Sequence, residues 1–263
     1  MQAGDLIARR YRLVRTEEYD LPGATRFVAH DTRLNADVTV DVISSLAPTA
    51  VVRAAHRAQL ARDRRLTRIL ATGTDRRGDE RHTYIVSERH IGVKLDDLLG
   101  KVAFVPATAA AIVGEAASAL GDAARSGLHH TQIRASSVTV TQRGRMVLSG
   151  LAVEGELASQ AGLKHKNTER ADAVALARLY ATAVTAIVAD AITIDDLPDD
   201  LSDAERDLCE ALLRGSGPKT LGDVTGALGQ GDRAALRTLV AEAPSLWWPA
   251  APVLAVEEAP VDV

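Results

Sequence analysis

The residues whose types and spacing could do chemistry are concentrated in one stretch, Gly127–Ala152. It contains the pair His129-His130, followed by the polar residues Gln132 and Ser137. A histidine in such a loop could act as a general base or bind a metal ion, because its neutral imidazole carries one free ring nitrogen near pH 7. No cysteine or further histidine lies at a ligand spacing from the pair. The sequence therefore favours a structural role for His130, in which it holds the loop by packing or hydrogen bonding.

The elements that must position this stretch are a helix before it and a β-hairpin within it. Pro106–Ser126 is rich in alanine and carries apolar residues at helical spacing, and Gly127 follows it in the usual C-terminal position. Two short apolar strands are expected around the polar turn Gln142-Arg143-Gly144. The strand residues are Val138, Val140, Met146 and Leu148.

Upstream, alternating apolar and polar residues predict three strands joined by short turns, at Tyr11–Thr16, Thr25–His30 and Asp37–Ile43. Residues 47–69 have helical composition and predict one helix. Tyr84–Gly92 is predicted to contain a further strand.

Downstream, apolar periodicity predicts helices over residues 171–188, 202–214 and 220–228. A further helix is expected near Asp232–Leu239. A proline-rich segment with Trp247 and Trp248 follows it, and no role is assigned to it.

The composition is that of an ordinary water-soluble globular protein. The chain has 263 residues, of which 46% are hydrophobic, 25% charged and only 3% aromatic. A net charge of −4 gives no global attraction to nucleic acid or membrane, and the single cysteine, Cys209, suits a reducing compartment. The first residues do not resemble a signal peptide. The most apolar window, Leu179–Ala189, is about half the ~20 residues of a membrane span and predicts a buried helix.

Several of these segments together resemble the eukaryotic-like Ser/Thr protein kinases. His130, Ile133, Arg134 and the hairpin are similar to the HRD-x-K-x-x-N loop of that family and to the strand that leads into its DFG motif. The segments RYRLV (10–14), AHDTRL (29–34) and VTVDVI (38–43) are similar to the start of an actinobacterial kinase. The resemblance covers about residues 4–228.

The resemblance fails at the residues that would do chemistry. Where the family has its phosphate-binding lysine, base aspartate, metal-binding asparagine and metal-binding aspartate, this chain has Asp41, Gln132, Ser137 and Ser149 in turn. The last of these positions is Ser149 or Gly150, depending on where the alignment gap is placed, and neither residue carries a charge. The glycine-rich phosphate loop is replaced by EEYDLPG (17–23), with three carboxylates that would repel a triphosphate. The resemblance thus implies a degenerate kinase, a pseudokinase without catalytic, cofactor or metal site. Two residues keep the structural positions of the family, His130 and Asp172, the second of which hydrogen-bonds the catalytic-loop backbone there.

The resemblance also implies a fold. It is of the α+β class, a bilobed protein-kinase-like fold with a β-rich N-lobe, a helical C-lobe and a shortened activation segment. The expected divisions are an N-lobe with hinge over residues 1–92, a C-lobe over 93–228 and a C-terminal extension over 229–263. Within the activation-segment slot, Lys164, His165 and Lys166 make the chain locally basic.

Among kinase-like proteins, the chain most resembles the cytoplasmic pseudokinase domain of actinobacterial MviN/MurJ-type peptidoglycan-precursor flippases. That likeness implies a catalytically inactive regulatory scaffold that active Ser/Thr kinases phosphorylate and that then recruits an FHA-domain protein to control precursor export. It implies a cytoplasmic domain tethered to the inner face of the plasma membrane, and no nucleic-acid partner. The alternative function is a divergent nucleotide-binding switch or weak kinase.

Two surface features leave alternatives open. Thr168, Thr193 and Thr220 are candidate phosphosites, but a threonine followed three residues later by an acid, as at Thr193 and Thr220, is also the pattern of a helix capping box. The second feature is an arginine-rich region over residues 53–81, diluted by acids. It is either a solvated face or a docking surface for an anionic polymer, an acidic partner or a membrane.

Overall fold

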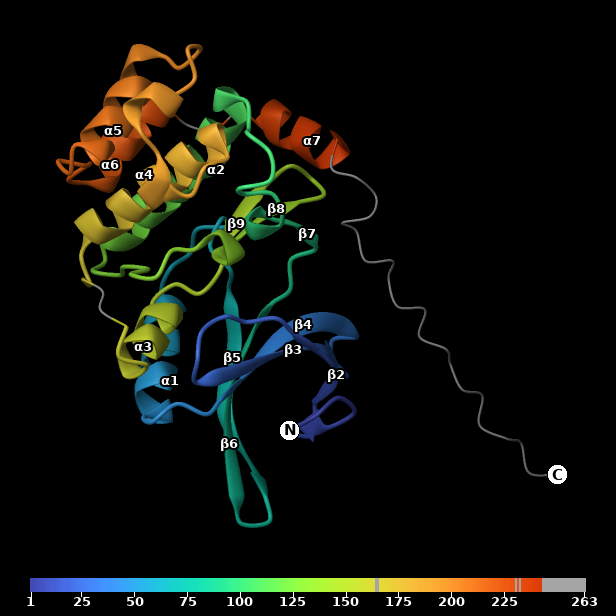
Figure 1. Ribbon diagram of the computed structural model, residues 1–263. Coiled ribbons are helices and arrows are strands. Elements are labelled where there is room, and N and C mark those ends of the chain that lie inside the picture. The colour runs from blue at the N-terminus through green and yellow to red at the C-terminus, as the bar shows by residue number, and fades with distance from the viewer. Residues whose placement is uncertain (164–165, 230, 232, 243–263) are drawn as a thin grey trace.

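The computed structural model describes residues 1–163, 166–229, 231 and 233–242. The first half of the chain forms a six-stranded antiparallel sheet with the strand order β1-β2-β3-β4-β6-β5 (Figure 1). Its strands are β1 (Leu6–Ile7), β2 (Tyr11–Glu17), β3 (Ala24–Asp31), β4 (Ala36–Ile43), β5 (Ile69–Arg77) and β6 (Glu80–Glu88).

The two faces of this sheet are buried in different ways. One face carries an apolar cluster that includes Tyr11, Phe27 and Val40. Buried and more exposed residues alternate at the start of β2, whereas β3 and β4 each contain a run of consecutive buried residues. The other face packs against helix α1 (Pro48–Ala58), where Val51 and Ala55 of the helix join Ile85 of β6.

A second, three-stranded antiparallel sheet is formed by β7 (Gly92–Lys94), β8 (Val138–Thr141) and β9 (Met146–Leu148). Gly92 lies against the backbone of β8 so closely that a Cβ atom there would be 2.2 Å from the Val140 carbonyl oxygen. The linker after α1 joins this sheet, because the Leu148 amide donates to the Arg65 carbonyl at 2.7 Å and the Thr67 amide donates to the Leu148 carbonyl at 2.8 Å. The linker thereby connects the two sheets.

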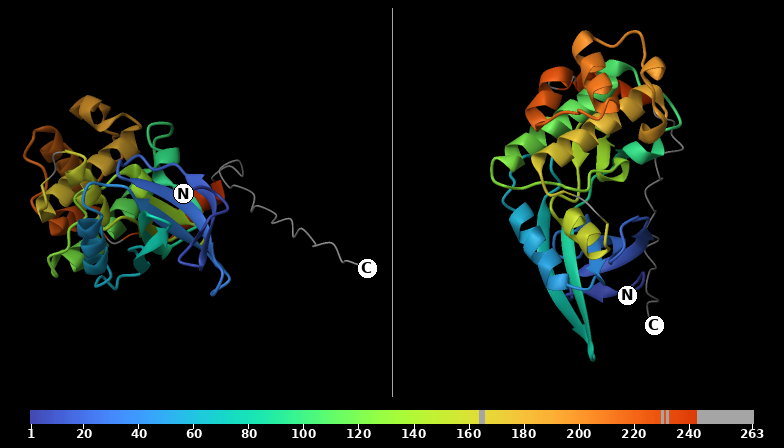
Figure 2. Two further views of the ribbon diagram at one scale, coloured as in Figure 1. Left: turned by 90° about the horizontal axis from the view of Figure 1, so that it is seen from below. Right: turned by 60° about the vertical axis from the view of Figure 1, so that its left-hand side comes forward.

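Most of the remaining helices gather beside the second sheet, on the side away from the six-stranded sheet, whereas α3 (Val153–Gln160) lies beside α1 (Figures 1 and 2). Alanines dominate the buried face of α2, so neighbouring helices can approach it closely. Threonine and serine side chains cap α4, α5 and α6 at their first turns. These helices are α2 (Pro106–Ala124), α3 (Val153–Gln160), α4 (Glu169–Thr185), α5 (Asp203–Leu213), α6 (Leu221–Leu228) and α7 (Arg233–Glu242), and short 3₁₀ turns lie at Leu95–Asp97, Ala135–Ser137, Ala189–Ala191 and Ile194–Asp196.

Many of the predicted local elements are confirmed. The three predicted early strands correspond to β2, β3 and β4, and the predicted hairpin corresponds to β8 and β9. The predicted helices correspond to α2, α4, α5, α6 and α7. Trp247, Trp248, Lys164 and His165 lie outside the described residues, as does residue 232 at the start of the last predicted helix.

The predicted fold class is wrong. In place of a bilobed protein-kinase-like fold with a helical second lobe, the chain forms a six-stranded antiparallel sheet that curves like a nearly closed barrel, combined with helices in a mixed α/β arrangement. The second sheet lies among the helices, so strands are not confined to the first part of the chain. The physical reason is long-range pairing: β7 pairs with β8, and β4 pairs with β6, across large separations in sequence.

Two segments that contributed to the predicted fold have a local structure different from the one expected. The helix expected over residues 47–69 ends at Ala58, because the following residues turn back to pair with Leu148 and then enter β5. The expected activation segment contains a helix, α3, that packs against α1. Within the part of the chain that the structure describes, no helix combines the length and the apolar character that crossing a bilayer requires.

Candidate functional site

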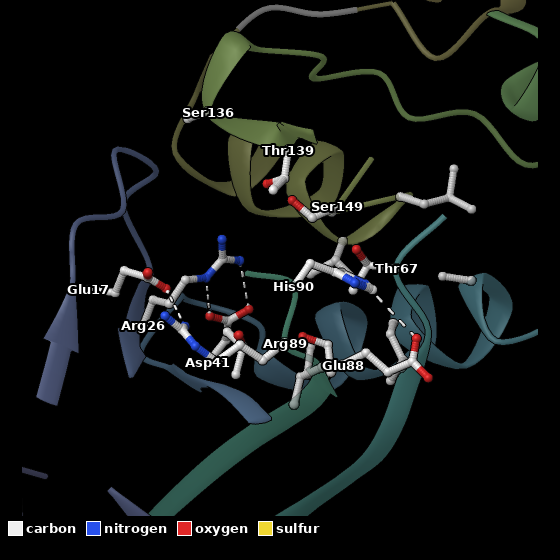
Figure 3. Close-up of a pocket in the computed structure, with 18 of the residues that line it drawn as sticks. Glu17, Arg26, Asp41, Thr67, Glu88, Arg89, His90, Ser136, Thr139 and Ser149 are labelled. Atoms are coloured by element: carbon white, nitrogen blue, oxygen red, sulfur yellow. Dashed lines mark hydrogen bonds and ion pairs between the residues drawn. The ribbon is translucent and has the colours of Figure 1, made fainter. Parts of the chain in front are cut away.

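The candidate site is a pocket between the six-stranded sheet and the β8–β9 hairpin (Figure 3). Its free volume is about 80 Å³, whereas small-molecule sites usually offer about 300–1,000 Å³. Charged and polar side chains line much of it, namely Glu17, Arg26, Thr39, Asp41, Thr67, Ser87, Glu88, Arg89, His90, Lys94, Ser136, Thr139 and Ser149.

Asp41, which stands where the resembled family has lysine, forms an ion pair with Arg26. The β3–β4 register places the two residues directly opposite each other. Arg26 Nε donates to Asp41 Oδ1 at 2.7 Å and Nη2 donates to Oδ2 at 2.9 Å, a bidentate geometry that is among the strongest pairings available to arginine. Burial alone would lower the pKa of Arg26, but the Asp41 carboxylate outweighs this effect and raises that pKa. The Arg26 guanidinium therefore stays charged beside the Asp41 carboxyl group.

The ring of Tyr19 connects this pair to a second one. The guanidinium carbon of Arg26 lies 4.0 Å from the centre of the ring, and that of Arg134 lies 5.8 Å from it. Arg134 in turn contacts Asp20 and forms an ion pair with the buried carboxylate of Glu154, with 2.7 Å between Nη2 and Oε2. Burial, reinforced by the Glu154 charge, raises the pKa of Tyr19, so the phenol is neutral. Cation–π contacts of this kind stabilise both guanidinium groups in their positions beside the ring.

A third group of charges forms around Glu17 at the end of β2. Its carboxylate accepts a hydrogen bond from Arg89 at 3.3 Å and lies 3.8 Å from Lys94 Nζ. Burial would raise the pKa of Glu17, but Lys94 and Arg89 hold it below the ordinary value of 4.5. Glu17 is one of the carboxylates predicted to repel a triphosphate; the structure pairs it with two cations.

The remaining charges that line the pocket are Glu88 and His90. Glu88 pairs with Arg68 at 3.0 Å and lies 4.0 Å from His90 Nε2. Burial lowers the pKa of His90, against the opposing influence of Glu88 and with a smaller contribution from Arg145. The lining therefore holds three cations and three carboxylates, each of them with a partner of opposite charge.

Asp172 of α4 holds the loop between α2 and β8 through hydrogen bonds to the loop backbone. The buried carboxylate accepts the His130 amide at Oδ2 (2.8 Å) and the Thr131 amide at Oδ1 (2.7 Å). These bonds accompany a left-handed backbone at Thr131, where φ is +64°. His130 is fully buried, and its Nε2 donates to the Ser149 carbonyl at 2.7 Å. Desolvation by burial raises the pKa of Asp172.

The two predicted degenerate positions in the hairpin region lie close together. The Ser149 amide donates to the Ser137 carbonyl at 2.8 Å, and Ser149 lines the pocket. The Ser137 hydroxyl is buried and donates to Glu154 Oε2 at 2.8 Å, so it faces a carboxylate of the same chain.

Gln132, the third such position, is not part of the pocket. It lines a separate groove along α4, together with Thr168 and several basic residues. The structure therefore brings Asp41 and Ser149 to one cavity and places Gln132 at another.

All three candidate phosphosites are exposed and lie at helix starts. Thr168 caps α4, where its hydroxyl accepts the Ala171 amide at 3.2 Å. Thr193 and Thr220 form reciprocal capping boxes with Asp196 and Asp223, respectively. The capping interpretation thus holds for both of them, while the hydroxyls remain on the surface.

Two residues that form the ion pairs with Asp41 and Arg134, namely Arg26 and Glu154, were not predicted from the sequence. Arg26 had a usable signal, because a hairpin that turns at residues 32–35 places Arg26 opposite Asp41. Glu154 had no comparable local signal, since its partners Arg134 and Ser137 come from a different loop.

Comparison with known proteins adds no assignment. No protein-family model matches the chain, and a search of curated proteins finds no relative. Among the residues that the structure describes, no group of three or more His, Cys, Asp and Glu side chains could hold a metal ion.

Proposed function

We propose that this chain is a catalytically inactive regulatory scaffold, a pseudokinase in the functional sense, which acts by binding partner proteins. The observation that carries the proposal is the ion-paired pocket. The position of the phosphate-binding lysine is occupied by Asp41, whose partner Arg26 is bound in bidentate fashion and stacked on Tyr19.

The pocket has little to offer a nucleoside triphosphate. A phosphate chain needs cations that are free to contact it, and here the cations that line the pocket already contact Asp41 and Glu17. Displacing these pairs would leave buried carboxylates uncompensated, which costs several kcal/mol. The free volume of about 80 Å³ adds a steric argument to the electrostatic one.

The test is a comparison of thermal unfolding in buffer, with ATP and Mg²⁺, and with Mg²⁺ alone. The expected result is a shift below about 1 °C, since a ligand stabilises a protein only in proportion to its binding. A rise of several degrees that depends on ATP would favour the divergent nucleotide-binding switch instead. The double variant Arg26→Ala/Asp41→Lys is the matched control, because it removes the ion pair and restores a lysine to the pocket.

The partners belong to the same proposal and come from the sequence resemblance. Active Ser/Thr kinases would phosphorylate a surface threonine, and an FHA-domain protein would then bind, at the inner face of the plasma membrane where peptidoglycan-precursor export is controlled. The three exposed threonines support this order of events as accessible acceptors. The test is the affinity for an FHA domain before and after treatment with an active kinase, with Thr168→Ala, Thr193→Ala and Thr220→Ala variants to locate the acceptor. Equal affinity in the two states would refute recruitment by phosphorylation.

A further inference from the structure

A second cavity of the molecule carries only positive charge. It is an open groove along α4 with a volume of about 820 Å³. Among the residues that the structure describes, its charged lining consists of Lys166, Arg170 and Arg178 and includes no carboxylate. The other lining residues are Thr131, Gln132, Ile133, Thr168, Ala171, Val174 and Ala175.

The cations of this groove are weakly engaged. Arg170 donates to the Ser216 carbonyl at 3.3 Å, and Arg178 donates to Asp190 at 3.4 Å. Both side chains of the Arg178–Asp190 pair are more than half exposed, at 54% and 86%. Exposed pairs of this kind contribute little, so a ligand carboxylate can replace Asp190 at small cost.

The floor between the cations is apolar. Arg170, Val174 and Arg178 follow one another at intervals of four residues, which places them on one stripe of the helix. Val174 and its neighbours Ala171 and Ala175 are half-buried, which leaves part of their apolar surface facing the groove. Thr131, Gln132 and Thr168 add polar side chains along the edge.

We propose that this groove binds an extended acidic peptide segment of a partner protein. The cations select carboxylates, the apolar floor accommodates small aliphatic side chains, and the threonines and Gln132 can hydrogen-bond a peptide backbone. The apolar floor and the recessed shape favour a peptide over a membrane surface, which needs a flat or protruding basic face.

The geometry also sets the spacing of the acidic residues. Eight residues of helix separate Arg170 from Arg178, a rise of about 12 Å at about 1.5 Å per residue. An extended peptide covers about 12 Å in roughly four residues, at about 3.3 Å each. The preferred ligand therefore has two carboxylates four residues apart, with small apolar residues between them.

The experiment uses fluorescence anisotropy with a labelled decapeptide that has glutamates four residues apart, separated by alanine, valine and alanine. A peptide of the same composition with adjacent glutamates is the first control. We expect the spaced peptide to bind more tightly, and its affinity to fall as salt is raised from about 50 to about 300 mM.

Two double variants of the full chain test the location. Arg170→Glu/Arg178→Glu should weaken binding by about tenfold or more, since both carboxylates then meet like charges. Arg170→Gln/Arg178→Gln should weaken it in the same direction with a smaller change in charge. The matched control is Arg53→Glu/Arg62→Glu, which reverses two exposed arginines outside the groove and should change the dissociation constant by less than about twofold.

The proposal is overturned if the groove variants bind the spaced peptide as wild type does, if the adjacent-glutamate peptide binds equally well, or if no peptide binds. Groove-dependent binding to vesicles containing phosphatidylserine, without peptide binding, would assign the surface to a membrane. Self-association that is lost only in the groove variants would assign it to a second copy of the chain. Every arm reads out binding at α4, so the result is independent of whether the other pocket binds nucleotide.

Discussion

Two cavities of this protein, the pocket between the sheets and the groove along α4, have opposite electrostatic arrangements. In the pocket between the sheets, each of the three cations has a carboxylate partner from another part of the chain. In the groove along α4, the three cations have no carboxylate among the lining residues. The cations and carboxylates of the pocket are paired within the chain, whereas the groove has its positive charge available for a partner.

The difference follows from where each arginine lies. Arg26 projects from a central strand, with a side chain only 15% exposed, and a charge so enclosed must be paired. Arg178 projects from the outer side of a helix, where water solvates the guanidinium whether or not Asp190 is near. Replacing a charged side chain of the pocket and replacing one of the groove should therefore change the free energy of unfolding by very different amounts.

The largest effect is expected for Arg26→Ala. This change leaves the Asp41 carboxylate buried without its partner and removes the contact with Tyr19. The free energy of unfolding should fall by about 3–5 kcal/mol, as measured by urea unfolding followed by circular dichroism. The control is Arg26→Met/Asp41→Leu, which removes both charges and should recover most of the loss. A loss below about 1 kcal/mol for Arg26→Ala would contradict the view that the pocket depends on this pair.

The next effect concerns Asp172, which holds the loop between α2 and β8. Asp172→Ala leaves the buried amides of His130 and Thr131 without their acceptor, and should cost about 2–3 kcal/mol. Both Arg134, on the pocket side, and Gln132, on the groove side, should show altered chemical environments in NMR spectra. An unchanged spectrum around one of the two cavities would show that the loop does not couple them.

A smaller effect, with a defined pH dependence, is expected for Glu17→Gln. At pH 7 the loss of the contacts with Arg89 and Lys94 should cost about 1 kcal/mol. Because the folded-state pKa of Glu17 lies below its ordinary value of 4.5, the stabilisation is present above pH 4.5 and is lost as the pH falls through the folded value. Urea unfolding at several pH values should therefore show wild type and variant converging in acid. A difference that stays constant down to pH 3 would contradict the ion-pair explanation.

Local pattern predicted much of the secondary structure but not its assembly. Alternation located β2, β3 and β4 to within one or two residues, since each strand has one buried face. The arginine-rich segment after Ala58 was predicted as helix from its composition, yet Leu66 pairs with Leu148. Such pairing joins residues far apart in sequence, which local periodicity does not encode, and the predicted fold class was wrong for the same reason.

The candidate site was predictable in part. Asp41 was singled out because it stands where the resembled kinase family has a lysine. Its carboxylate was expected to repel the phosphates of a nucleotide. The register of the β3–β4 hairpin shows instead that Arg26 neutralises it, an inference that the turn at residues 32–35 would have allowed. The groove was not foreseen, because Gln132 and Arg178 are brought together only by packing of the loop against α4.

The smallest effect is expected for Arg178→Glu on stability. The side chain is more than half exposed, and its charged partner Asp190 is more exposed still. Urea unfolding should give a free energy within about 0.5 kcal/mol of wild type, roughly a tenth of the loss expected for Arg26→Ala. Arg206→Glu is a sharper comparison on the helical side, since Arg206 donates to the Pro198 carbonyl at 2.7 Å and is half-buried. A loss above about 1 kcal/mol for Arg178→Glu would mean that the groove cation is structural. A loss near zero would agree with a cation that folding does not require and that is available to a ligand at the groove.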